Sequence, residues 1–221
     1  MRRAGQENGH FTSVIFAFRS KFSPIFTHDM EPTLLLQHIA EHITLTADEQ
    51  AYFVSLLHHR TIKKRQFLTQ EGDIAKGPVF VTEGILRNYS LDKNGFEHVI
   101  QFAPPGWWIG DMDSMIKQQP GTLYCDALED SKVLWLWKSD LDKLYGAVPK
   151  FERFFRILAE NAIGAYQARL INILSLPAKE RYANFCQQYP SLIDCLPQKQ
   201  VASYIGVTPE FLSKMLHAAD D

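Results

Sequence analysis

The sequence predicts an α+β protein in which an antiparallel β-roll of the jelly-roll type is followed by one long helix and a small helix-turn-helix domain. Three observations favour this order. Glycines separate short β-branched and aromatic segments about every eleven residues through the first half of the chain. Residues 150–176 contain no proline, as a long helix requires. Residues 196–216 have the apolar spacing of two short helices that meet at a glycine.

Composition sets broad limits on the class of protein. The chain has 221 residues, of which 46% are hydrophobic and 22% charged, with a net charge of −2. This balance is typical of a core-forming protein and excludes disordered, fibrous and membrane-spanning classes. The three cysteines, Cys125, Cys186 and Cys195, have neither CxxC nor Cys/His ligand spacing, so we expect no disulfide framework, no metal site and a cytoplasmic location.

Residues 1–29 differ from the rest of the chain. Arg2 and Arg3 precede an apolar run over residues 11–18, which superficially suggests a signal peptide. Arg19 and Lys21 follow that run at once, and no small-residue cleavage site is present. We therefore expect residues 1–29 to be a disordered extension or the product of an upstream mis-start.

Residues 31–59 have a helical pattern. Apolar residues recur there at intervals of three and four, and Thr46 is positioned to cap a second helix that carries Tyr52, Phe53, Leu56 and Leu57. We expect these two helices to pack beside the β-roll.

The β-roll is predicted from five short strands. We expect them over residues 78–82, 85–90, 96–102, 122–127 and 132–137. Asp92 to Gly95 supply a hairpin turn between the second and third of these. In the strand over residues 96–102, Phe96, His98, Ile100 and Phe102 alternate with the other residues and are expected to face inward.

His98 is the residue in this strand that a metal-dependent jelly-roll enzyme would use. Such an enzyme needs clustered ligands on adjacent strands, whereas His98 stands alone in its strand. A partly buried core histidine is the expected interpretation. We predict no catalytic residue, no metal site and no cofactor, and the sequence contains no nucleophile–base pair or phosphate-binding loop that would indicate an enzyme.

After a short helix over residues 140–145, the sequence predicts an unbroken helix over residues 149–176. Such a helix is too long to be buried by a small roll. Its predicted apolar stripe contains small residues that allow close approach of another helix; the stripe comprises Phe151, Phe154, Phe155, Leu158, Ala162, Ala165, Ala168, Asn172 and Ile173. We expect a second copy of the chain to pack there, and the alternative is packing only against the chain's own domains.

The last segment, residues 177–221, contains a further helix over residues 178–189 and then the helix-turn-helix. Gly206 ends the first helix of the motif, Thr208 caps the second and Pro209 occupies its first position. Phe211, Leu212 and Met215 are expected to face inward. The residues expected to face outward, and so to contact DNA, are Thr208, Pro209, Glu210, Ser213, Lys214 and His217. The alternative is a helical corner without DNA affinity.

The helix-turn-helix, together with the LSLPAKERY run at residues 174–182, resembles the C-terminal domain of the cyclic-AMP receptor protein and fumarate-nitrate regulator (Crp/Fnr) superfamily of bacterial transcription factors. The glycine pattern is similar to that of the cyclic-nucleotide-binding domain; it comprises Glu71-Gly72, Val81 to Gly84, Asn94-Gly95, Pro105-Gly106 and Ile109 to Asp111.

The resemblance implies a domain plan and a function. Residues 30–147 would form a cyclic-nucleotide-binding-like roll, residues 148–176 a dimerisation helix and residues 177–221 the DNA-binding domain. The protein would then be a homodimeric transcriptional regulator that binds a pseudo-palindromic operator in double-stranded DNA and contacts RNA polymerase, with no membrane association.

The resemblance also locates an effector pocket, which departs from the family pattern. Members that bind cyclic AMP use a glycine–glutamate pair for the ribose and, eleven and twelve residues past that glycine, an arginine and a hydroxyl residue for the phosphate. Here Gly110 and Asp111 are followed by Gly121 and Thr122, with Met112 beside the pair. The phosphate's cationic partner is missing. We therefore expect a degenerate sensor whose effector is unknown and is not cyclic AMP.

Other pocket candidates and one other function remain open. Trp107, Trp108, Met112, Met115 and Tyr124 would either line an apolar pocket or fill the roll. Residues 177–221 are close to neutral, which predicts modest non-specific affinity for DNA. The alternative function is therefore a ligand-binding or protein-interaction module that has lost DNA binding.

Overall fold

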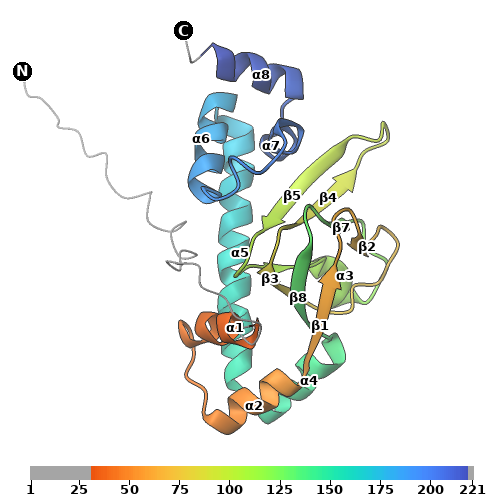
Figure 1. The fold of residues 1–221 in the computed structure, drawn as a ribbon, viewed down its shortest axis with the longest axis vertical. Coiled ribbons are helices and arrows are strands. Elements are labelled where there is room, and N and C mark those ends of the chain that lie inside the picture. The colour runs from red at the N-terminus through yellow and green to blue at the C-terminus, as the bar shows by residue number, and fades with distance from the viewer. Residues whose placement is uncertain (1–30, 219–221) are drawn as a thin grey trace, which may run out of the picture.

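The computed structural model describes residues 31–218. A β-roll with helices at its lower end is joined by a long helix to a small helical domain (Figure 1). The α+β class and the predicted order of roll, long helix and helical domain are confirmed. The predicted extension over residues 1–29 lies outside the described residues.

The roll consists of two four-stranded antiparallel sheets. The first has the order β1-β8-β3-β6 and the second β2-β7-β4-β5. Their bounds are β1 Leu57–Ile62, β2 Phe67–Thr69, β3 Val79–Glu83, β4 Leu86–Leu91, β5 Glu97–Ala103, β6 Trp108–Ile109, β7 Tyr124–Ala127 and β8 Ser131–Leu136. The five predicted strands correspond to β3, β4, β5, β7 and β8.

The prediction of helix through residue 59 is wrong at its end. The helices here are α1 (Glu31–Ala40) and α2 (Ala47–Ser55), and the chain enters strand β1 two residues later. Thr46 caps α2 as predicted. β1 pairs with β8 along its whole length, from Leu57 opposite Leu136 to Ile62 opposite Ser131. Pairing with a strand 69 to 79 residues away overrides the local helical pattern.

The inward face predicted for the third strand is also wrong in part. Val99 is buried, whereas Phe96 and His98 are exposed. The register between β4 and β5 shifts so that consecutive residues Asn88 and Tyr89 face Gln101 and Val99, which leaves Ile100 as the extra residue of a bulge. A one-residue shift moves the side chains before it to the other face. His98 is therefore not a core histidine, and its Nε2 lies 3.2 Å from Asp92 Oδ2.

The lower core is built between the first sheet and the helices around it. It contains α1, α2, α4 (Lys138–Ala147) and the start of α5 (Lys150–Ser175). Phe53 of α2 stacks on Phe151 of α5 with ring centroids 4.6 Å apart, and Phe80 of β3 and Phe154 of α5 are fully buried. The predicted short helix over residues 140–145 is longer at both ends and includes Gly146.

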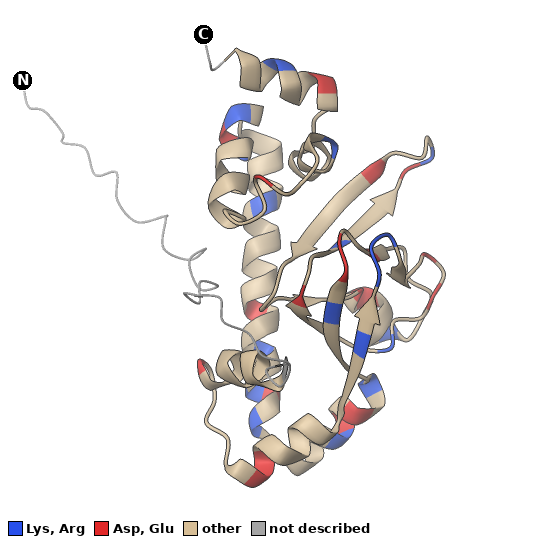
Figure 2. Cartoon of the chain, in the orientation of Figure 1, with Lys and Arg blue, Asp and Glu red and all other residues tan. Residues whose placement is uncertain are grey.

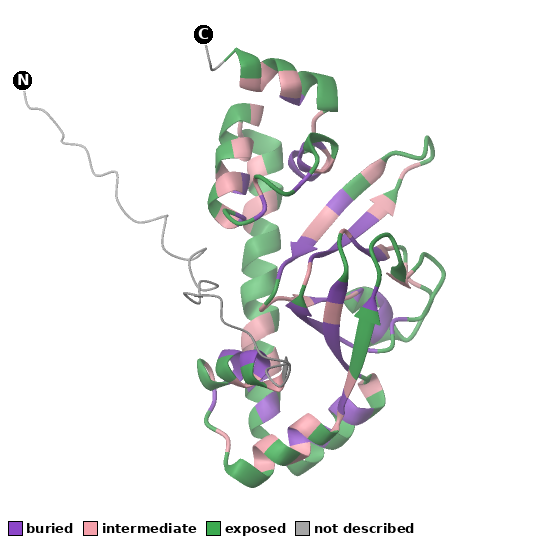
Figure 3. Ribbon diagram, viewed as in Figure 1, coloured by how far each residue is buried: buried purple, intermediate pink, exposed green. Residues whose placement is uncertain are grey.

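Helix α5 spans 26 residues, about 39 Å. Within this helix only Phe151 and Phe154 are buried. Figure 3 shows its middle section exposed between the roll and the small helical domain, which are called the two lobes below. Of the small residues in the predicted stripe, Ala162 and Ala165 are exposed and Ala168 is partly buried.

The small domain consists of α6 (Ala178–Gln188), α7 (Gln198–Ile205) and α8 (Pro209–His217). Its core is continuous with that of the roll, because Tyr189 and Tyr204 pack against Phe102 of β5 with ring centroids 5.8 and 5.6 Å away. Between residues 31 and 218, no helix is both long enough and apolar enough to cross a membrane.

Candidate nucleic-acid interface

The turn between α7 and α8 has the geometry that the sequence predicts. Gly206 adopts φ 72°, ψ 46°, a left-handed conformation that favours glycine. The Thr208 hydroxyl accepts a hydrogen bond from the Phe211 backbone N–H at 3.2 Å, and Pro209 begins the helix. Local chemistry therefore fixes the angle at which α8 leaves the turn.

Helix α8 presents a mixed polar face to solvent. Thr208, Pro209, Glu210, Lys214 and His217 are exposed, and Ser213 is partly buried. Figure 2 shows acidic and basic residues together on this helix. All six predicted contact residues thus lie on one short element that reaches solvent, as an element that enters a DNA groove must.

The predicted inward face of α8 is wrong at one residue. Leu212 is fully buried and Met215 is partly buried, but Phe211 is 52% exposed. Phe211 lies at a shallow groove of about 420 Å³ between α5, α6 and α8. Its lining comprises Leu176, Pro177, Ala178, Arg181, Val207, Thr208 and Phe211.

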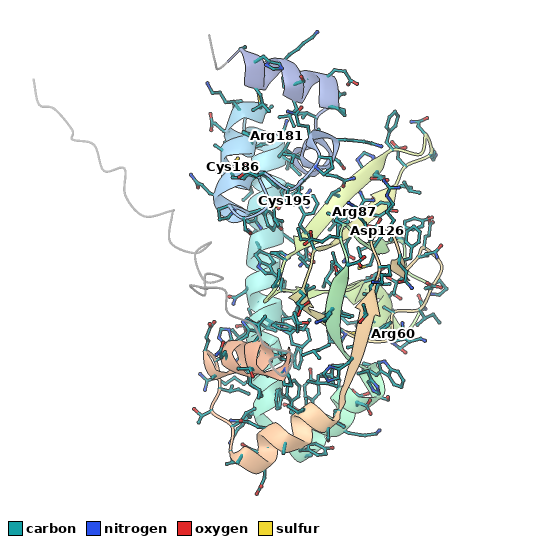
Figure 4. All side chains as sticks on the ribbon, in the orientation of Figure 1. Arg60, Arg87, Asp126, Arg181, Cys186 and Cys195 are labelled. Carbon is teal, nitrogen blue, oxygen red and sulfur yellow. The ribbon has the colours of Figure 1, made fainter. Side chains whose placement is uncertain are left out.

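Arg181 is a residue of this region that the sequence analysis did not select. It projects from α6 (Figure 4), and its Nη1 lies 3.5 Å from the position that a Cβ on Gly206 would occupy. Its Nε is buried and has no hydrogen-bond partner. The fold thus places a cation beside Thr208 at the start of α8. The sequence offered no signal for this contact, because the rest of α6, a loop and α7 lie between Arg181 and Thr208 in the chain.

Helix α7 is attached to the free edge of strand β5. The Ser203 hydroxyl donates to the Glu97 carbonyl at 2.6 Å and accepts from the Val99 N–H at 2.9 Å. Arg169 of α5 donates to the carbonyls of Val99 at 2.7 Å and Tyr204 at 2.8 Å, and also to that of Ile100. Side chains therefore satisfy backbone groups that an edge strand would otherwise leave open.

A buried arginine extends this contact into the roll. Arg87 Nε lies 2.7 Å from Asp126 Oδ1, and Arg87 Nη1 bonds both Glu97 Oε2 and Gln200 of α7. Figure 4 shows Arg87 and Asp126 side by side on the roll. Burial lowers the pKa of Arg87, but its bonds with Asp126 and Glu97 outweigh burial and raise that pKa overall. The guanidinium remains charged and ties the two lobes together.

With α7 held by the roll, the outer face of α8 stays accessible. The contacts above involve α7 residues Gln200, Ser203 and Tyr204, and none of the six predicted DNA-contact residues takes part in them. This arrangement separates the surface that positions the domain from the surface that can bind a ligand.

The predicted effector residues lie around the start of α3 (Met112–Lys117). Asp111 is buried and caps this helix by accepting from the Ser114 N–H at 3.0 Å. A Cβ on Gly121 would lie 2.4 Å from Asp111 Oδ2, so these two residues are in direct contact. The Gly110 carbonyl accepts from Asn88 Nδ2 at 3.0 Å. Gly110, Asp111 and Gly121 are thus brought together.

Met112 and Thr122 do not close over this cluster, because both are exposed. Lys117, on the same helix, pairs with Asp113 at 2.7 Å. Of the other pocket candidates, Trp108 packs on Phe80 and Trp107 packs on Tyr189 of the small domain. Both tryptophans are partly buried, Trp108 against the lower core and Trp107 between the roll and the small domain.

The sequence of the roll matches a known family model. The cyclic nucleotide-binding domain model matches residues 59–147. The match begins within β1 and ends with α4, so it covers most of the roll described above.

Relatives that align with more of the chain, and a solved structure, extend the comparison. The anaerobic regulatory protein of Aggregatibacter actinomycetemcomitans is 26% identical, with 71% of this chain and 65% of that protein aligned. The fumarate and nitrate reduction regulatory protein of Vibrio cholerae is 24% identical over 71% of this chain and 66% of its own length. The chain thus spans just under two thirds of these relatives. FixK2 from Bradyrhizobium japonicum has a similar fold, with a TM-score of 0.62, 20% identity and coverage of 73% and 83%.

Proposed function

We propose that the chain is a bacterial transcriptional regulator of the Crp/Fnr superfamily that binds a specific DNA sequence as a homodimer. The observation that carries this proposal is the capped, solvent-exposed helix α8, which projects from a domain anchored to the roll. The names of the relatives, which describe regulatory proteins, support the same function.

Helix α8 is proposed to bind in the major groove. Glu210 can accept a hydrogen bond from a cytosine amino group and Lys214 can donate to guanine, so these two residues are assigned to base contacts. Thr208 and Ser213 are assigned to phosphate contacts, and Pro209 and His217 to the ends of the contact surface. Arg181 is added as a phosphate contact, because its side chain lies beside the start of α8.

Helix α5 is proposed to pair with α5 of a second copy. Ile163, Tyr166, Leu170 and Ile173 are exposed and recur at intervals of three and four, which is the spacing of a two-helix seam. Phe151 and Phe154 of the originally predicted stripe are buried inside the chain and cannot serve this purpose. The proposed dimer seam therefore lies on a different face of α5 from the predicted stripe, along the exposed apolar residues.

The proposed sensor lacks the chemistry for cyclic AMP. A phosphodiester needs a cationic partner when it is buried. The position where the family has its arginine is Gly121, which lies against the Asp111 carboxylate instead. We propose that the effector, if the protein uses one, is not cyclic AMP, and that the regulator acts in the cytoplasm and contacts RNA polymerase.

Selection from a randomised DNA library by the full-length protein tests this function. A pseudo-palindrome with half-sites about one helical turn apart is expected. Glu210→Ala should relax selectivity at one base pair per half-site by about 1–3 kcal/mol, whereas Arg181→Ala should weaken all sequences alike and reduce the salt dependence by about one phosphate contact.

Glu129→Ala, an exposed residue of the roll, is the matched control and should leave the selected sequence unchanged. If the wild-type protein enriches no sequence at low salt, the alternative is favoured, namely a ligand-binding or protein-interaction module that has lost DNA binding. If Glu210→Ala selects as the wild type does, Glu210 makes no base contact.

A further inference from the structure

Three side chains at the end of α1 bring metal-binding atoms together. In His38, Glu41 and His42, one ligand atom from each residue lies within 4.8 Å of the other two. The Ile39 carbonyl accepts hydrogen bonds from the N–H groups of His42 and Ile43, both at 3.0 Å, so the helical turn continues past Ala40. His38 and His42 therefore lie one turn apart on the same face.

Packing orients the two imidazole rings. The His38 ring centroid is 5.9 Å from that of Phe80 and 5.8 Å from that of Phe154, and the His42 ring is 5.9 Å from Phe154. The two imidazoles meet edge to face with centroids 5.6 Å apart. Aromatic contacts on the inner side thus hold both rings before any ligand arrives.

Glu41 lies on the outer side of this pair. Its Oε2 is 3.9 Å from His38 Nδ1, and its side chain is 47% exposed. Of the three residues, His38 is buried, His42 partly buried and Glu41 exposed. Glu41 is thus the member of the cluster that reaches solvent.

We propose that His38, Glu41 and His42 bind one divalent transition-metal ion, Zn²⁺ above all. Two imidazoles and one carboxylate are a ligand set that zinc accepts, and the His-x-x-Glu-His spacing places two imidazoles on one helical face as in known zinc sites. Zinc–ligand distances of about 2.0–2.2 Å require the three side chains to close in by small rotations. The ion would join three side chains at the end of α1 and so stabilise that turn of the chain. No metal site was predicted from the sequence, because neither the cysteine spacing nor the isolated His98 indicates one.

Metal titration of the chelator-treated full-length protein tests the proposal. Zn²⁺ binding is measured by competition with a chromophoric indicator, and Co²⁺ is used as a spectroscopic probe of coordination. We expect one equivalent of Zn²⁺ to bind with micromolar or tighter affinity, the visible absorption of a low-coordinate Co²⁺ site, and a metal-dependent rise in Tm.

Glu41→Gln and His42→Gln should each weaken Zn²⁺ binding at least tenfold and remove the rise in Tm, with unchanged circular dichroism in the absence of metal. His98→Gln is the matched control, because His98 is also beside a carboxylate but belongs to the β4–β5 hairpin. The proposal is overturned if the wild type binds no Zn²⁺ in the micromolar range. It is equally overturned if both cluster variants bind as the wild type does, which would place the ion elsewhere.

Discussion

Gly121 lacks the arginine side chain that binds phosphate in the family, and the packing around it leaves no room for any side chain. A Cβ there would lie 2.4 Å from Asp111 Oδ2 and 3.1 Å from the Ser114 Cβ. Asp111 is fixed in turn by its cap on α3. An arginine at this position would therefore have to displace the cap, so we expect the Gly121→Arg substitution not to restore a cyclic-AMP site.

We predict that Gly121→Ala lowers the free energy of unfolding by about 1–3 kcal/mol, because the added methyl group forces Asp111 away from α3. Chemical denaturation measures the change. Gly164→Ala is the matched control: a Cβ there meets no atom within 4 Å, and alanine in an exposed helix interior should add about 0.5–1 kcal/mol. Equal shifts of the same sign in both variants would show that Gly121 has no special packing role.

At the scale of elements, strand β5 links the roll to the helix-turn-helix. Its outer edge bonds to Ser203 of α7 and to Arg169 of α5, and its inner neighbour β4 carries Arg87, which reaches Gln200. Each of these bonds joins residues far apart in sequence. The orientation of α7, and with it that of α8, therefore depends on a small set of polar side chains at one strand.

We predict that Arg169→Leu lowers the free energy of unfolding by about 2–4 kcal/mol, because three backbone carbonyls lose a charged donor. Arg156→Leu is the control on the same helix. Arg156 is exposed and pairs only within the helix, with Glu160, so its loss should cost less than about 0.5 kcal/mol.

Tryptophan fluorescence in urea provides the measurement for this pair, since Trp107 lies against Tyr189 at the junction of the lobes. The expected result is an earlier transition for Arg169→Leu than for Arg156→Leu. Coincident transitions would mean that the Arg169 bonds do not contribute to holding the lobes together.

At the scale of the whole molecule, α5 carries several large apolar side chains that residues 31–218 leave exposed. The exposed residues on it include Ile163, Leu170 and Leu174. A contiguous apolar surface of this kind on a long helix is typical of an interface. Because it runs between the two lobes, pairing there would place two copies of α8 on the same assembly, as a palindromic DNA site requires.

We predict that Leu170→Glu converts the dimer to a monomer, because the proposed seam would bury an unpaired charge. Sedimentation equilibrium at micromolar concentration measures the change. Ala165→Glu, from the originally predicted stripe, is the comparison and should remain dimeric, because Ala165 lies on a different face of the helix from Leu170. Dimeric Leu170→Glu together with monomeric Ala165→Glu would restore the original stripe.

The sequence alone determined the features that depend on neighbouring residues. The glycine-separated strands, the Thr46 and Thr208 caps and the left-handed Gly206 turn all follow from local backbone chemistry, and the structure has each of them. The departure of Gly121 from the family pattern was likewise visible in the sequence, because the motif has a fixed spacing.

Only the tertiary structure decided the features that depend on distant partners. β1 is a strand because β8 pairs with it, Phe96 and His98 face outward because β5 bulges against β4, and Arg181 lies beside α8 because α6 packs there. Which face of α5 is exposed also depends on tertiary structure, because the two lobes cover the other parts of the helix. Periodicity reveals that a helix has an apolar side, but the free energy of burial depends on which surfaces meet, and the packed chain alone specifies that.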